Sequence, residues 1–95
     1  MMEGSYKATK GLIKVRVKVE LKTIREIQIT GDFFMYPEDK LWDLEHTLEG
    51  TEASRAQILS KVKAFYEQAA VVTPGMVPGD FVEAIVRAIG CENLA

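Results

Sequence analysis

Few side chains of this 95-residue chain are of a type that does chemistry alone. The single histidine, His46, falls on the polar side of a predicted helix, and the single cysteine, Cys91, follows a predicted helix end. Nucleophilic triads need three converging groups, and a structural zinc site needs four ligands. The pair Glu38 and Asp39 suits the positive start of a helix better than an acid–base dyad. We therefore expect no catalytic residue and no metal site.

A row of basic side chains is the second candidate. Lys14, Arg16 and Lys18 share the solvent face of one predicted strand, and Lys10 lies nearby. They could attract a phosphate-bearing ligand or an acidic partner, or they could simply keep an exposed sheet face soluble. The net charge of −2 gives no overall attraction to nucleic acid or anionic membrane. The predicted sheet also lacks the stacked aromatics of an RNA-binding sheet. We expect neither partner.

The third candidate is the aromatic segment that contains Gly31, Asp32, Phe33, Phe34 and Tyr36. The glycine allows a tight turn, and the carboxylate faces the positive end of the following helix. Two adjacent phenylalanines cannot both enter one core from an extended chain, because successive side chains face opposite ways. Either one of them covers a partner or ligand, or the packing of the turn takes up both.

The elements that position these residues begin with strands. After Leu12, residues 13–22 alternate between apolar side chains at odd positions and charged side chains at even positions. This period is typical of a strand with one buried and one solvated face. Ile27 and Ile29 continue it in a second strand, too close in sequence for a crossover helix, so the two strands pair antiparallel. A short strand around residues 5–9 completes the sheet, since two strands alone are rarely stable.

The register of this hairpin can be predicted from charges. Placing Lys22 opposite Glu26 also places Arg16 opposite Asp32, and both pairs join opposite charges. This register leaves a loop at residues 23–25.

From residue 37 onward the apolar period becomes helical. Pro37 is predicted as a first helical residue and Gly50 as the end of that helix. A capping box opens a second helix at Ser54. A third helix starts at Pro78 and ends at Gly90, although Val77 before it cannot cap it. The residues predicted to face the core are Leu41, Leu44, Leu48, Ile58, Val62, Phe65, Ala69, Phe81, Ala84, Ile85 and Ala88.

Strands followed by helices predict an α+β fold, with a three-stranded antiparallel sheet and about three helices packed on one face. Residues 1–95 are expected to form a single domain. The sequence shows no apolar stretch long enough to span a bilayer and no apolar core of a signal peptide, and with one cysteine it has no internal disulfide. We expect a cytoplasmic setting.

The chain resembles the C-terminal accessory domain of lipoate–protein ligases, and most of all the form that is a separate small subunit in bipartite ligases. The resemblance covers about residues 6–90, and its most specific block is Gly31-Asp32-Phe33-Phe34. The supporting blocks are residues 10–17, 27–30, 36–38, 44–50 and 78–85.

This resemblance implies an accessory subunit without catalytic residues of its own. Such ligases use ATP and Mg²⁺ to make lipoyl-AMP, then transfer the lipoyl group to a lysine of a lipoyl domain in 2-oxoacid dehydrogenase complexes or the glycine cleavage system. The catalytic large subunit holds ATP, Mg²⁺ and lipoate, and the small domain caps or reorganises that pocket. The fold is expected to resemble NifU and SufE scaffolds.

The resemblance also suggests roles for the candidate residues. We expect Gly31, Asp32, Phe33, Phe34 and Tyr36 to form the interface with the catalytic subunit. Lys10, Lys14 and Arg16 would add positive potential near the phosphates. The alternative is a non-enzymatic adaptor or scaffold of NifU/SufE-like fold, although a single cysteine supplies no ligand set for an iron–sulfur cluster.

Overall fold

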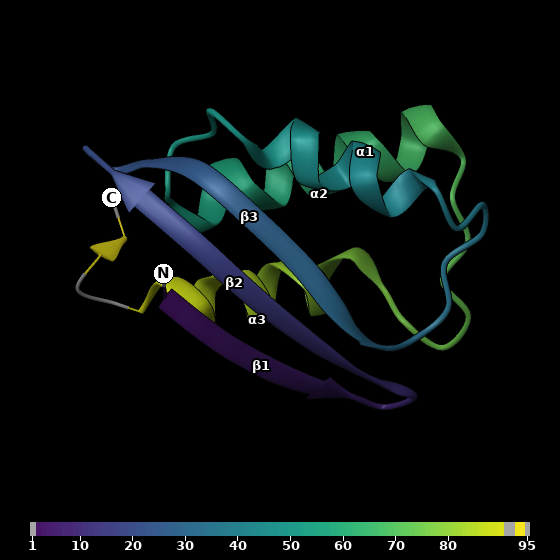
Figure 1. Ribbon diagram of the computed structural model, residues 1–95. Coiled ribbons are helices and arrows are strands. Elements are labelled where there is room, and N and C mark those ends of the chain that lie inside the picture. Colours follow the sequence, from purple (N-terminus) through teal and green to yellow (C-terminus); the bar gives the residue numbers. More distant parts are fainter. Residues whose placement is uncertain (1, 91–92, 95) are drawn as a thin grey trace.

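The computed structural model describes residues 2–90 and 93–94, so Cys91 lies outside the described residues. Three strands, β1 (Met2–Ala8), β2 (Gly11–Glu20) and β3 (Thr23–Asp32), form an antiparallel sheet in the order β1-β2-β3. Three helices follow, α1 (Lys40–Leu48), α2 (Arg55–Ala69) and α3 (Pro78–Ile89). The predicted α+β class and element order are confirmed, and β1 is longer than expected (Figure 1).

The helices cover one face of the sheet. α3 packs against β1 and β2, α2 packs between α1 and α3, and α1 packs beside β3 (Figure 1). Ile13, Val15 and Val17 are buried beneath them, whereas the charged side chains at positions 14, 16, 18 and 20 of β2 are exposed. The alternation in sequence therefore identified both faces of the strand.

Gly4 permits a close approach of α3 to the sheet. A Cβ atom on Gly4 of β1 would lie 2.5 Å from the Ala88 backbone nitrogen of α3 and 2.6 Å from its Cα. Any larger residue would push α3 away from the sheet, where Phe81 and Ile85 are fully buried.

The predicted hairpin register is wrong. Arg16 lies opposite Gln28, not Asp32, and the turn consists of Leu21 and Lys22. Both turn residues have positive φ (51° and 63°), as a type I′ turn requires, although neither is glycine. Arg16 instead pairs with Glu3 on β1, with 3.0 Å between Nε and Oε1. Residues 23–25, which were expected in a loop, all belong to β3.

A bulge in β3 explains why Ile24 is buried despite its even position. Lys18 pairs with Glu26 and Val19 pairs with Ile24, so Arg25 is the extra residue. The Ile24 N–H also donates to the Thr51 carbonyl (2.9 Å). This start of β3 is thus fixed by the segment after α1.

Most predicted helix boundaries are confirmed. Ser54 Oγ accepts a hydrogen bond from the Gln57 N–H (3.2 Å), as a capping residue does. α3 starts at Pro78, where the Asp80 carboxylate compensates for the missing cap by accepting the Val77 N–H (2.9 Å). All the residues predicted to face the core are buried except Leu41 and Ala69, which are half-buried.

The start of α1 was predicted three residues too early. The helix begins at Lys40, not at Pro37. The chain is still extended at Tyr36, which exchanges two backbone hydrogen bonds with Val72 (2.9 Å each), and a turn at residues 37–39 precedes the helix.

Candidate functional site

The aromatic segment after β3 directs its two phenylalanines in opposite directions. Phe33 turns inward, where its ring meets the buried Phe81 ring edge-on at 5.3 Å between centroids. Phe34 turns outward, is 64% exposed, and stacks parallel to the Tyr36 ring at 6.3 Å. Met35 between them is buried. The alternation argument is therefore confirmed, and it selects Phe34 as the exposed phenylalanine.

Two neighbouring segments hold this aromatic segment in place. The backbone bridge to Val72 fixes Tyr36, which remains 48% exposed. The next segment is a turn at residues 73–76. Pro74 and Gly75 at its two central positions predict a type II turn from the sequence. In the structure the Met76 N–H donates to the Thr73 carbonyl (3.0 Å) and Gly75 has φ of 76°, as this turn type requires. The Tyr66 hydroxyl hydrogen-bonds with Thr73 Oγ1 (2.8 Å). Burial raises the pKa of Tyr66, and this hydrogen bond opposes part of the rise.

A groove runs between the end of β3, the aromatic segment and α1. Its volume is about 490 Å³, and Thr30, Gly31, Phe34, Glu38, Leu41 and Trp42 are among the residues that line it. Trp42 is 68% exposed. From the sequence, Trp42 is predicted only to lie at the edge of the apolar stripe that Leu41, Leu44 and Leu48 form on this helix. A tryptophan at such an edge is a usable signal, because a large apolar ring left in water marks an interaction surface.

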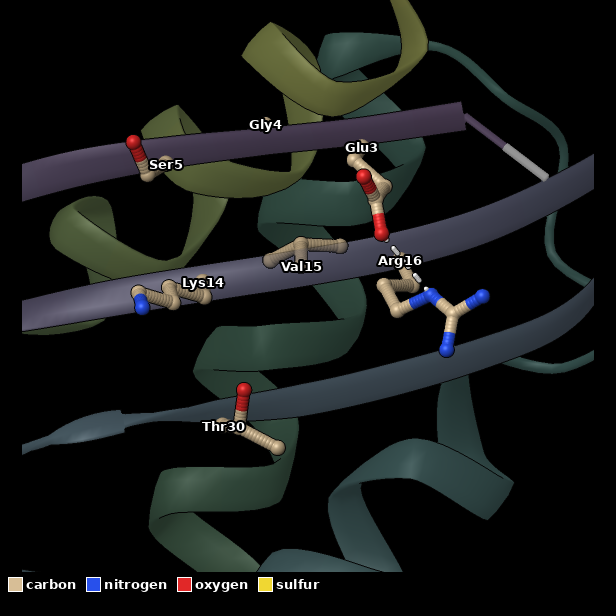
Figure 2. A pocket seen from close by; sticks show the side chains of 7 residues that line it. All are labelled: Glu3, Gly4, Ser5, Lys14, Val15, Arg16 and Thr30. Carbon is tan, nitrogen blue, oxygen red and sulfur yellow. Dashed lines mark ion pairs between the residues drawn. The ribbon is translucent and has the colours of Figure 1, made fainter.

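The three basic candidates do not gather at this groove. Lys14 and Arg16 line a shallow pocket of about 420 Å³ on the open face of the sheet, and their charged groups extend away from each other along β2 (Figure 2). Arg16 is engaged with Glu3.

Lys10 lies apart from them, in the β1–β2 turn, where its aliphatic stem packs against Gly75. The adjacent Gly11 approaches Asp32 and Phe33 closely. Lys10 is therefore the one basic candidate at the aromatic end of the sheet.

Two other titratable side chains, His46 and Glu83, make contacts within the fold. His46 is exposed, and its Nδ1 lies 2.8 Å from the Trp42 carbonyl oxygen. The Glu83 carboxylate accepts a hydrogen bond from Arg55 (3.0 Å), which lowers the pKa of Glu83 and links α3 to the start of α2. Within residues 2–90 and 93–94, no three His, Cys, Asp or Glu side chains gather as metal ligands. None of the described helices has the length and apolar character needed to cross a membrane.

The structure is thus an α+β fold with an exposed aromatic groove, a feature typical of a protein interaction surface. The chain belongs to the family of the bacterial lipoate protein ligase C-terminus, which it matches over residues 1–85. The resemblance noted in the sequence is thereby confirmed.

Two relatives agree with this assignment. The chain is 40% identical over 85 residues to lipoate-protein ligase A subunit 2 of Thermoplasma acidophilum, a match that covers 90% of this chain and 87% of that relative. It also matches a solved structure from an archaeal lipoylation system, described as a bipartite lipoate protein ligase and its E2 lipoyl domain from Thermoplasma acidophilum. That match has a TM-score of 0.83 and 41% identity, and covers 90% of this chain and 96% of the other. These comparisons favour the ligase interpretation over the adaptor, while the likeness to NifU and SufE stays a prediction.

Proposed function

We propose that this protein is the accessory subunit of a bipartite lipoate–protein ligase and acts with a separate catalytic subunit. The observation that carries the proposal is the 40% identity to a protein that is itself named as a second ligase subunit, over 87% of that relative's length. A match to the whole of such a subunit supports an equivalent role more strongly than a match to one motif would.

The chemistry would take place on the catalytic subunit. There the lipoate carboxylate would attack the α-phosphorus of ATP and release pyrophosphate, giving lipoyl-AMP. The amine of a lipoyl-domain lysine would then attack the acyl carbon and release AMP. Mg²⁺ would neutralise phosphate charge. No cluster of metal-ligand side chains occurs in the described part of this chain, so we assign no step of Mg²⁺ binding to it.

The accessory subunit would supply surface in place of reactive groups. Closing over the catalytic subunit would exclude water from the acyl-adenylate, which water would otherwise hydrolyse, and would order the loops around ATP. We also propose that this small subunit acts in the cytoplasm.

The exposure of the residues in the predicted interface suggests a different role for each of them. Gly31 and Asp32 would set the direction of the chain, and Phe33 would anchor the segment on the buried Phe81. Phe34 and Tyr36 would contact the catalytic subunit, because they are the exposed pair.

The basic residues can be ranked by position. Lys10 shares the aromatic end with that pair and is the best placed of them to approach the phosphates. Lys14 and Arg16 remain candidates on the open sheet face, although the ion pair with Glu3 already satisfies Arg16.

Reconstitution tests the function directly. The protein is mixed with the catalytic subunit from the same cell, ATP, Mg²⁺ and lipoate, and lipoyl-AMP is measured by mass spectrometry. We expect lipoyl-AMP only when both subunits are present, and lipoylated lysine when a lipoyl domain is added. An equal rate from the catalytic subunit alone, or no product from the pair, would overturn the proposal. Lys10→Ala is expected to raise the KM for ATP more than Lys14→Ala does.

A further inference from the structure

The groove is lined by exposed aromatic rings and by the backbone at the free edge of β3. Phe34 and Trp42 are the exposed aromatic side chains that line it, and the half-buried Leu41 lines it as well. Large apolar side chains that are about two-thirds exposed and share one concave surface are typical of a protein interaction site. Aromatic side chains in such places contribute most of the binding free energy.

The end of β3 supplies the backbone. β3 is an edge strand, and the Ile29 N–H points away from β2, since it donates to Glu45 Oε2 at 2.7 Å. Amide directions alternate along an antiparallel strand, so the Gly31 N–H points the same way as the Ile29 N–H. Both residues line the groove. An edge N–H beside apolar pockets is the arrangement used to bind an extended peptide.

The charge at the rim indicates what flanks such a peptide. Glu38 lines the groove, and Asp39 lies with it beside Trp42 in an adjoining hollow. The two carboxylates are exposed, and neither forms an ion pair with another residue in the described part of the chain. A complementary partner segment therefore carries a positive side chain next to its apolar one.

We propose that the groove between Phe34 and Trp42 binds an extended segment of the catalytic subunit. One apolar side chain of that segment inserts between the two rings, its backbone pairs with the Gly31 N–H, and a neighbouring Lys or Arg faces Glu38 and Asp39. This inference rests on the proposed function and extends the interface from the aromatic segment onto α1.

Isothermal titration of the catalytic subunit into this protein tests the groove. Trp42→Ala and Phe34→Ala should each weaken binding by about tenfold or more, as central aromatic contacts do. Leu21→Ala is the matched control, because Leu21 is 91% exposed in the β2–β3 turn at the other end of the sheet. It should change the affinity less than about twofold. Thermal unfolding of each variant shows that the fold is retained.

Two further measurements address the charge and the backbone. Glu38→Lys should weaken binding several-fold at low salt, with a smaller difference at about 1 M salt, where charges are screened beyond about 3 Å. Hydrogen exchange of the Gly31 amide should slow in the complex.

The outcomes separate this inference from the function on which it rests. If the unmodified protein does not bind the catalytic subunit, both fall. If it binds and Trp42→Ala behaves like Leu21→Ala, only the groove assignment falls. The assignment also falls if the protein alone forms a dimer that Trp42→Ala dissociates, because the groove would then bind a second copy.

Discussion

Replacing Glu45 should loosen the joint between α1 and β3. Its half-buried carboxylate accepts the Ile29 N–H at 2.7 Å, across the open edge of the sheet. Hydrogen bonds to charged groups contribute about 1.5–3 kcal/mol, and partial exposure favours the lower end of that range. Glu45→Ala should therefore lower the free energy of unfolding by about 1.5–2 kcal/mol. At about 4–8 °C per kcal/mol for a domain of this size, the Tm should fall by roughly 10 °C.

Urea and thermal unfolding followed by circular dichroism give both quantities. Glu45→Gln keeps an acceptor oxygen but loses the charge, so it should cost about half as much. Glu67→Ala, at an exposed position in the last turn of α2, removes the same charge and should change stability by less than about 0.5 kcal/mol. If Glu45→Ala and Glu67→Ala have the same free energy of unfolding and the same Tm, the hydrogen bond adds no stability and the reasoning is wrong.

Three other changes test the fold. Ser54→Ala should destabilise by about 1 kcal/mol in urea unfolding, and Ser54→Asp, which retains an acceptor at the helix start, should not. Burial raises the pKa of Tyr66 because it disfavours the phenolate. The stability that the neutral Tyr66 side chain contributes is therefore complete below the unfolded pKa of about 10, and it is lost as pH rises through the folded pKa. The stability advantage of the unmodified protein over Tyr66→Phe, which loses the bond to Thr73, should therefore shrink above pH 10; a constant difference would contradict the assignment. Gly31→Ala should cost at least about 2 kcal/mol, because φ is 146° there and the new Cβ would overlap the Leu12 carbonyl oxygen; a Tm equal to that of the unmodified protein would refute this.

Local patterns were sufficient where one short segment decides its own geometry. The alternation around Val15 assigned the faces of β2, because side chains of a strand alternate whatever lies beyond it. Pro74 and Gly75 predicted their turn, and Ser54 its helix start, since each of these residues acts on backbone groups within three positions. The Phe33–Phe34 argument worked for the same reason. The family resemblance then supplied the function, which none of these patterns contains.

Contacts between distant segments decided the rest. The register depended on a turn at Leu21 without glycine and on a bulge whose neighbour Ile24 bonds to residue 51, and opposite charges alone could not reveal either. The bridge from Tyr36 to Val72 delayed the start of α1. The groove forms where α1, which carries Trp42, packs beside the edge of β3. The sequence therefore determined which side chains could face out, and the packing of segments far apart in the chain determined which of them form one surface.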